Sequence, residues 1–207
     1  MLLVVDNGSI YTKQLTDFLT KKNFSFEKYT PHILKLNSLE KYESIILSGR
    51  RKNDKKINEV NSKIINFSIK NDKKLLGICY GAEILALTLG GTIRKTKSIQ
   101  KGNETIEILQ NNLITNNSIN VFESHSFEIS KLPNVLIPIG KSDNCNYEII
   151  QYEKKLIFGT QFHPEMTSDG NDLIEKFCSL WLILITLKNS LFYGTRRSSI
   201  TFTSSWG

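Results

Sequence analysis

The sequence predicts an α/β protein in which helices cover a central, mostly parallel β-sheet. Short apolar runs, each the length of one buried strand, lie at 2–5, 44–47 and 74–78. Between them, apolar residues recur at helical spacing over 10–19 and 57–69. Alternation of strands and helices in this order is typical of a layered α/β fold with a parallel sheet.

Turn-forming residues separate these segments where such a fold needs them. Asp6-Asn7-Gly8 follows the first strand as a turn signal, and Ser48-Gly49 closes the run at 44–47. Residues 24–29 alternate between apolar and polar, as expected of a strand. A helix over 82–89 is expected to stop at Gly90-Gly91.

The second half of the sequence is richer in strands, and the end of the sequence changes character. Strands are expected at 92–95, 104–109, 147–152 and 156–161, followed by a helix over 171–181. We therefore expect one domain over residues 1–181. Residues 182–207 contain no acidic residue and end in Ser/Thr-rich sequence. This tail is expected to be atypical, and disorder, binding to a partner and an artefactual origin are all open explanations.

Composition restricts the classes of function. The three cysteines are widely spaced and accompany only three histidines, so neither a disulfide framework nor a metal site is expected. The net charge is +7, but the densest basic run, Arg50–Lys56, has no interleaved aromatic residue, which argues against nucleic acid. No export signal is recognised, and the apolar run at 180–187 is far shorter than the roughly 20 residues of a membrane span. We expect a cytoplasmic protein with no membrane partner.

The segment Gly77-Ile78-Cys79-Tyr80-Gly81 joins a buried strand to a helix and has the context of a nucleophile elbow, with cysteine in place of serine. The chain must turn so sharply that side chains two positions either side of Cys79 would collide, hence the glycines. Such a turn holds the nucleophile at the carboxyl end of the sheet, where open α/β sheets bind ligands. The N-terminus of the following helix is expected to favour the thiolate. The structural alternative is a small buried cysteine between packing glycines.

A histidine and a carboxylate follow the last predicted strand, in the segment His163-Pro164-Glu165. Pro164 disfavours helical geometry at His163 and makes it extended. Because side chains at i and i+2 of an extended chain point the same way, His163 and Glu165 are expected on one side. A carboxylate there fixes the tautomer of the imidazole and stabilises its charged form. Alone the segment is more typical of a surface turn, but together with Cys79 it predicts a catalytic triad of Cys79, His163 and Glu165.

Five segments follow the order and spacing of a known family: Val4–Gly8, Ile45–Gly49, Leu76–Gly81, Gly90-Gly91 and Phe158–Glu165. On these segments, residues 1–181 resemble the class I glutamine amidotransferase family. The resemblance implies a flavodoxin-like three-layer fold with a mostly parallel central sheet plus a smaller antiparallel sheet. It also implies an enzyme that hydrolyses glutamine. In that chemistry Cys79 attacks the carboxamide, His163 acts as acid and base, and ammonia passes to a separate synthetase.

The resemblance assigns roles to further residues. The backbone N–H groups of Tyr80 and Arg50 are expected to form the oxyanion hole. The expected substrate-binding residues are Gly49, Gly81, Glu83, Ser124, His125 and Ser126. No cofactor is expected in this chain, because ATP and magnesium would belong to the partner synthetase.

The sequence departs from the family pattern at the predicted site. Arg50 and Arg51 stand where the family has glycine and proline, and a non-glycine residue does not adopt every backbone conformation of glycine cheaply. Glu83 stands where the family often has a glutamine that contacts the substrate. An acid there either pairs with the ammonium group of an amino acid or repels its carboxylate. These departures keep open a catalytically inactive regulatory subunit, and a partner-free γ-glutamyl hydrolase is a further alternative.

Within the family, the sequence is most similar to the stand-alone glutaminase subunit of archaeal-type GMP synthase, whose partner is an ATP-pyrophosphatase. Val4–Gly8, Ser124-His125 and Ser142–Glu148 carry this similarity. Phe127 departs from that branch, which has an acid two residues after His125. His125-Ser126 followed by an apolar residue is closer to the glutaminase subunits of anthranilate or aminodeoxychorismate synthase. Both assignments are open from the sequence.

Overall fold

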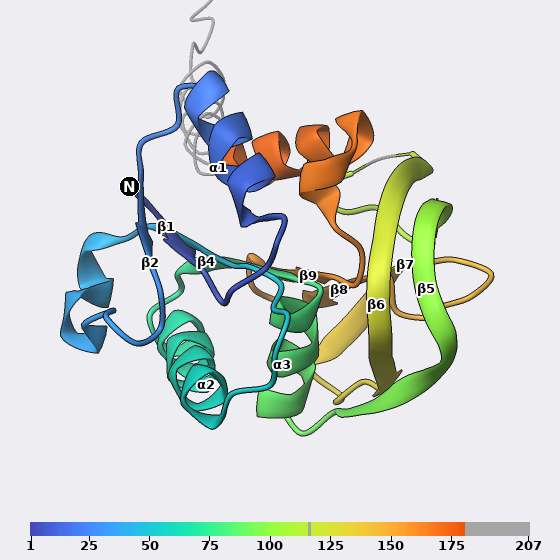
Figure 1. The fold of residues 1–207 in the computed structure, drawn as a ribbon, viewed down its shortest axis with the longest axis horizontal. Helices are drawn as coiled ribbons and strands as arrows, with labels where there is room; N and C mark the ends of the chain where they lie inside the picture. Colours follow the sequence, from blue (N-terminus) through green and yellow to red (C-terminus); the bar gives the residue numbers. More distant parts are fainter. Residues whose placement is uncertain (116, 181–207) are drawn as a thin grey trace, which may run out of the picture.

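The computed structural model describes residues 1–115 and 117–180 (Figure 1). The expected tail at 182–207 lies outside the described residues. Within them the α/β fold is confirmed, because helices lie on both faces of one nine-stranded sheet. None of the helices in this described part is long and apolar enough to cross a membrane.

Five strands form the parallel half of the sheet. In spatial order they are β2 (Phe26–Tyr29), β1 (Leu2–Val5), β3 (Ser44–Leu47), β4 (Lys74–Ile78) and β9 (Ile157–Thr160). This is the strand order of a flavodoxin-like sheet, as expected. Because β4 lies between β3 and β9, the loops that follow these three strands meet at one edge of the sheet.

The other half of the sheet is antiparallel and is continuous with β9. It consists of β8 (Ile149–Tyr152), β7 (Leu136–Lys141), β5 (Thr92–Ile108) and β6 (Ile119–Lys131). β5 and β6 form a long hairpin, and β5 pairs with β7 only through Glu107 and Ile108. This part is the smaller antiparallel sheet that the family resemblance implies.

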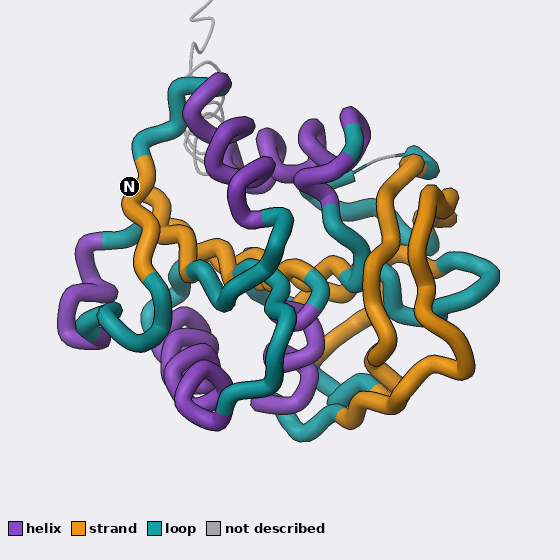
Figure 2. Tube along the Cα trace, viewed as in Figure 1, coloured by secondary structure: helices purple, strands orange, loops and turns teal. Residues whose placement is uncertain are grey.

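Helices cover both faces of the sheet (Figure 2). One face packs against α1 (Thr12–Lys21) and a helix at 168–180, and the other against α2 (Lys55–Lys70) and α3 (Tyr80–Thr88). Alternation along β1 divides its side chains between these layers, since Leu2 and Val4 belong to the first core and Leu3 and Val5 to the second. Two short 3-10 helices complete the described elements, η1 (Leu36–Lys41) and η2 (Pro164–Met166).

The parallel half matches the sequence pattern better than the antiparallel half. β6 and β7 are not among the predicted strands, and the predicted strands at 92–95 and 104–109 are parts of the single strand β5. In β6 every second residue from Ile119 to His125 is buried, but Glu123 and His125 are polar, which hides the alternation. β7 contains Pro138 and Gly140, which usually interrupt strands.

A buried polar network ties two loops to α2. The Asn7 backbone N–H donates to Ser48 Oγ at 2.9 Å, and Asn7 Nδ2 donates to the Ser48 carbonyl oxygen at 2.9 Å. Asn61 Nδ2 donates to Asn7 Oδ1 at 2.7 Å. All three residues are buried. The network fixes the loops after β1 and β3 relative to α2, which the expected turn-forming role of Asn7 does not include.

Replacing Asn61 with alanine should lower the free energy of unfolding by about 1–3 kcal/mol, because Asn7 Oδ1 loses its buried donor. Urea unfolding followed by circular dichroism measures this loss. Glu59→Ala is a control on the exposed side of the same helix. It removes an ion pair with Lys63 and should cost no more than about 0.5 kcal/mol. Equal losses in the two variants would contradict the role of the network.

Candidate active site

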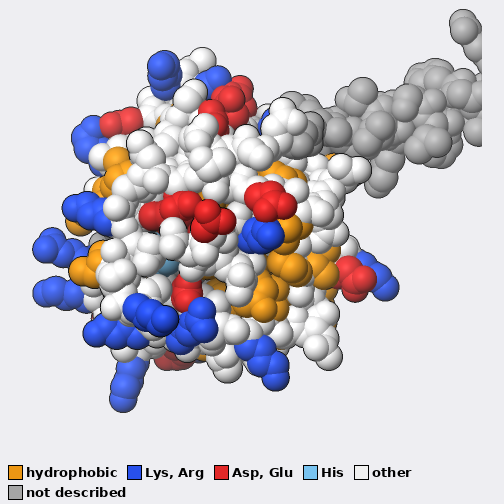
Figure 3. Space-filling model, turned by 90° about the vertical axis from the view of Figure 1, so that its right-hand side faces the viewer, with side chains coloured by type: hydrophobic (Ala, Val, Ile, Leu, Met, Phe, Trp, Pro, Cys, Tyr) orange, Lys and Arg blue, Asp and Glu red, His pale blue; other side chains and the backbone are white. Residues whose placement is uncertain are grey.

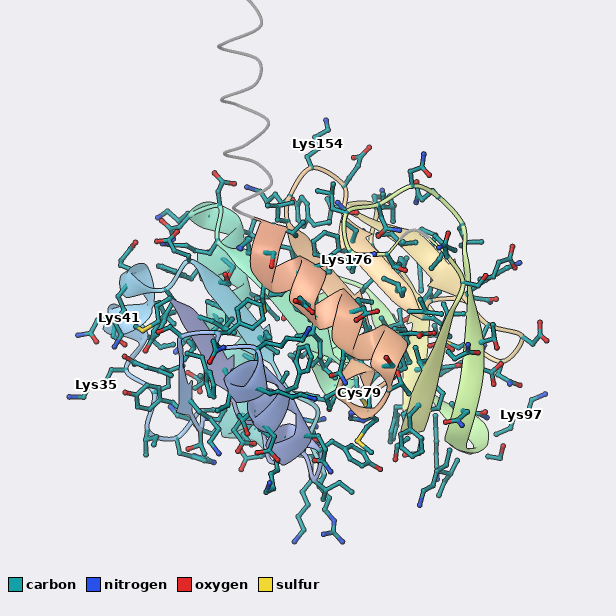
Figure 4. The ribbon with its side chains drawn as sticks, turned by 90° about the horizontal axis from the view of Figure 1, so that it is seen from above. Lys35, Lys41, Cys79, Lys97, Lys154 and Lys176 are labelled. Atoms are coloured by element: carbon teal, nitrogen blue, oxygen red, sulfur yellow. The ribbon has the colours of Figure 1, made fainter. Side chains whose placement is uncertain are left out.

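Cys79 occupies the turn between β4 and α3 with a backbone conformation that L-residues rarely adopt. Its φ is 51° and its ψ is −106°, which costs on the order of 1–3 kcal/mol unless the surroundings hold it. Its backbone N–H donates a 2.7 Å hydrogen bond to the Thr160 carbonyl oxygen at the end of β9. Figure 4 shows Cys79 at the edge of the sheet, between α1 and the β5–β6 hairpin. The backbone therefore has the geometry of a nucleophile elbow.

The glycines either side of Cys79 are required by backbone packing. A Cβ on Gly77 would lie 2.4 Å from the backbone C and O of Gly81. A Cβ on Gly81 would lie 2.5 Å from the Leu47 carbonyl oxygen in β3. Rotating a side chain relieves neither collision, so both positions need glycine. Gly81 does not line the cavity described below, so its expected role in substrate binding is replaced by a packing role.

His163 is held by both its backbone and its ring. Its backbone N–H donates to the Phe122 carbonyl oxygen in β6 at 2.9 Å, and its φ of −101° and ψ of 90° are extended, as Pro164 predicts. The ring Nδ1 lies 2.9 Å from Glu165 Oε1, and both side chains are buried. Glu165 belongs to η2, so a tight helical turn joins the pair. The expectation that alternation in an extended chain aligns them is wrong in its reason.

Two more residues position the imidazole. A Cβ on Gly49 would lie 2.9 Å from His163 Cε1, so glycine leaves room for the ring. Gly49 does not line the cavity, which corrects its expected role in substrate binding. The Tyr11 ring packs edge-on against His163 with centroids 4.5 Å apart, and its hydroxyl donates to Ser124 Oγ at 3.2 Å. Sequence reasoning missed Tyr11, whose only signal is its place in the loop after the first strand.

Cys79 and His163 line one cavity of about 470 Å³, a size suited to a small molecule. Within the described residues His163 Nε2 makes no hydrogen bond, and catalytic hydrogen bonds are often long in ligand-free enzymes. Glu165 lies behind the imidazole, outside the lining. The remaining lining residues are Ser9, Ile10, Tyr11, Arg50, Arg51, Lys52, Asn53, Tyr80, Glu83, Ile99, Ser124, His125, Ser126 and Phe127.

The two N–H groups expected at the oxyanion hole lie beside the thiol and on the adjoining loop. The Tyr80 N–H is directed at the Cys79 sulfur. The Arg50 N–H finds no backbone or side-chain acceptor in the part of the chain that the structure describes. Arg50 does not have a positive φ, so it occupies its loop without the strain expected of a residue that replaces glycine.

The side chain of Arg50 is fixed on the cavity wall. Its guanidinium carbon lies 3.8 Å from the centroid of the Tyr80 ring, a cation–π stack. Its Nη1 donates to Asn58 Oδ1, which also accepts the Tyr80 hydroxyl at 2.8 Å. The departure from the family pattern at Arg50 therefore adds a rigid cation beside the elbow.

Three carboxyl groups oppose ionisation of the Cys79 thiol. Burial raises the pKa of Cys79 well above its ordinary value, and the charges of Glu83, Glu123 and Glu165 raise it further. Only the Tyr80 N–H acts markedly in the other direction. The expectation that the N-terminus of α3 produces a thiolate is therefore wrong for the ligand-free site, where the thiol is protonated.

His125 forms a buried pair with Glu123, with Nε2 and Oε2 2.9 Å apart. Its Nδ1 is 2.8 Å from the Phe127 carbonyl oxygen. Burial opposes the charged imidazole, but the hydrogen bond and charge of Glu123 raise the pKa of His125 above its ordinary value. Because protein groups occupy both ring nitrogens, His125 forms a fixed wall, and its expected hydrogen bonding to substrate is not available. Ser124 and Ser126 do line the cavity.

The protonated thiol should make Cys79 slow to alkylate. Its raised pKa means that little thiolate exists near pH 7, so iodoacetamide should react at least about tenfold more slowly than with the same cysteine in the urea-unfolded chain. Mass spectrometry of the Cys79 peptide measures the rate, which should still be rising above pH 9. A rate at pH 7 equal to that of the unfolded chain would contradict this assignment.

Comparison with known proteins agrees with the fold and the site. The family model "Glutamine amidotransferase class-I" matches residues 3–179. The stand-alone glutamine-hydrolyzing GMP synthase subunit of Methanocaldococcus jannaschii is 28% identical over 188 residues, which cover 87% of this chain and 97% of the relative. The subunit of the same name from Pyrococcus furiosus is 29% identical over 188 residues, covering 87% and 98%.

Solved structures show the same fold. A provisionally assigned GMP synthase subunit from Thermoplasma acidophilum has a TM-score of 0.79 at 24% identity, covering 91% of this chain and 96% of that one. A glutamine amidotransferase from Thermotoga maritima has a TM-score of 0.69 at 21% identity, covering 91% and 84%. The match of the family model over nearly all of the described residues establishes the relationship: this chain belongs to the class I glutamine amidotransferase family.

Proposed function

We propose that this chain is a glutaminase that hydrolyses glutamine to glutamate and ammonia through a thioester on Cys79. The supporting observation is the convergence of two unusual structures on one cavity. These are a cysteine held at a φ of 51° and an imidazole whose far nitrogen is fixed by a buried carboxylate. Nucleophile, base and orienting acid are the parts that acyl transfer requires.

The first half of the reaction forms the thioester. Glu165 accepts a hydrogen bond from His163 Nδ1–H, so Nε2 is free to take the thiol proton from Cys79. The sulfur attacks the carboxamide carbon of glutamine, and the N–H groups of Tyr80 and Arg50 stabilise the negative oxygen. The imidazolium of His163 then protonates the leaving nitrogen, ammonia departs, and a glutamyl thioester is left on Cys79.

The second half releases glutamate. His163 Nε2 removes a proton from a water molecule, and the resulting hydroxide attacks the thioester carbon through the same oxyanion site. The carbon–sulfur bond breaks, the sulfur regains a proton from His163, and glutamate leaves. The enzyme returns to the protonated thiol that burial favours in the ligand-free site.

We further propose that the ammonia passes to a separate synthetase of the ATP-pyrophosphatase type for GMP synthesis. The names of the archaeal relatives support this, because the chain matches almost their whole length. A Staphylococcus epidermidis GMP synthase that is 30% identical over 184 residues is matched over only 35% of its length. ATP and magnesium would then be bound by the partner. An aromatic-pathway synthetase is the alternative partner.

The mouth of the cavity supports docking of a protein. Three large apolar side chains there are exposed, Ile10 by 61%, Ile99 by 73% and Phe127 by 44%. The exposed cations Arg51 and Lys52 lie on the same rim. Figure 3, viewed from the side of the β5–β6 hairpin, shows basic side chains gathered along its left and lower edges. Apolar side chains rimmed by charge are typical of protein interaction sites.

Cys79→Ala should abolish ammonia release from glutamine and labelling by a diazoketone analogue of glutamine. Glu165→Gln should lower kcat by about 10²- to 10⁴-fold, because the imidazole loses the charge that orients it. Ammonia release, measured with a coupled dehydrogenase in the presence of the synthetase, tests both. Cys178→Ser, outside the cavity, should retain activity. Full activity of Cys79→Ala would rule out the thioester mechanism.

The ATP-pyrophosphatase partner of GMP synthase, supplied with XMP, ATP and magnesium, should stimulate glutaminase activity. Ile99→Asp should weaken the dependence on partner concentration about tenfold, as expected for loss of roughly 1–2 kcal/mol at an apolar contact. Ile33→Asp is the matched control, since Ile33 is 65% exposed but does not line the cavity. Stimulation only by a chorismate-binding synthetase would refute the assignment to GMP synthesis.

A further inference from the structure

Glu83 is a buried acid within reach of the reacting thiol. It lies one helical turn after Cys79 on α3, and its backbone N–H donates to the Cys79 carbonyl oxygen at 3.0 Å. The residue is only 7% exposed, and the exposed part faces the cavity that Cys79 and His163 line. Burying a carboxylate is costly unless hydrogen bonds or opposite charge compensate it, so its partners are informative.

The partners of Glu83 leave one oxygen open to the cavity. Oε1 accepts a long hydrogen bond of 3.4 Å from Gln161 Nε2. Oε2 has no hydrogen-bond partner among the described residues, and it is not one of the carboxylate oxygens sealed from solvent. No lysine or arginine of the described part lies within 4.0 Å of either oxygen. Glu83 therefore presents an unpaired acceptor to whatever enters the cavity.

The free acid of Glu83 carries a penalty that a cation would relieve. Burial raises the pKa of Glu83 above its ordinary value, while the hydrogen bond from Gln161 and the charges of Arg50, His125 and His163 only partly offset burial. A positively charged ligand at Oε2 would stabilise the ionised form directly. The glutamine that the family often has at this position could offer an amide dipole but no charge.

Positive charge lies elsewhere in the same cavity. Arg50 is held against Tyr80 and Asn58, and Arg51 and Lys52 are exposed on the rim. The cavity thus contains an anion near the nucleophile and cations toward its mouth. An α-amino acid carries the complementary charges on a single carbon, so it matches this distribution where an uncharged amide does not.

We infer that Glu83 is a specificity-determining residue that binds the free α-ammonium group of the substrate, while the cationic rim faces its α-carboxylate. The inference rests on the proposed glutaminase function and deepens it. It restricts the substrates to carboxamides of free α-amino acids. Amides that lack the amino group leave Glu83 without its cation and are disfavoured.

The test compares labelling of Cys79 by a diazoketone analogue of L-glutamine with labelling by the same molecule without its amino group. The wild-type chain should react about 10- to 100-fold faster with the amino-acid form, since a buried charge-assisted hydrogen bond is lost without it. Glu83→Gln keeps the size of the side chain and a hydrogen-bonding group for Gln161. It should reduce this preference to within about threefold, with circular dichroism confirming the fold.

Glu128→Gln is the matched control. Glu128 is also buried, but its carboxylate pairs with Arg94 on the hairpin and does not line the cavity. This variant should keep the wild-type preference. A preference that survives in Glu83→Gln, or a wild-type chain that labels equally with both reagents, would overturn the role of Glu83 while leaving the glutaminase intact. A wild-type chain that neither reagent labels, even with the synthetase present, would instead remove the proposed function and this inference with it.

Discussion

The site depends on one backbone hydrogen bond, from the Cys79 N–H to the Thr160 carbonyl oxygen, 2.7 Å long. It extends the pairing of β4 and β9 one residue past the end of β4, at the point where the chain turns into α3. The bond fixes Cys79 in its positive-φ conformation. It also sets the start of the segment that carries His163. Because two neighbouring parallel strands supply both residues, more than eighty intervening residues do not need to be arranged by the site itself.

The surroundings of the sulfur are more acidic than a reactive thiolate would favour. Glu83, Glu123 and Glu165 all act on Cys79. Farther from the cavity, burial and the charge of Glu123 raise the pKa of Glu148 to about 9. The resting state is therefore a neutral thiol beside an imidazole that can accept its proton. Such a site spends little time as a free nucleophile, which limits reactions with oxidants and alkylating agents before a ligand arrives.

How far the sequence reveals this molecule depends on whether a feature is local. Buried apolar runs and turn residues predict the parallel half, and the elbow and the histidine segment predict the two halves of the site. Contacts between distant segments escape the pattern. The packing of Gly49 against His163, the edge-on ring of Tyr11 and the pair of Glu123 with His125 all depend on how the chain folds rather than on a motif. The polar pair also hides β6, because buried polar residues imitate an exposed strand.

The bridge between the His163 N–H and the Phe122 carbonyl oxygen has a mechanical consequence. Phe122 belongs to β6, and the hairpin that β6 forms with β5 also carries the apolar residues Ile99 and Phe127. The hairpin is anchored to the rest of the sheet only by the short pairing of β5 with β7. A force applied to its outer surface is therefore transmitted through a single peptide link to the backbone of the catalytic base. The molecule has a lever whose short arm ends at the imidazole.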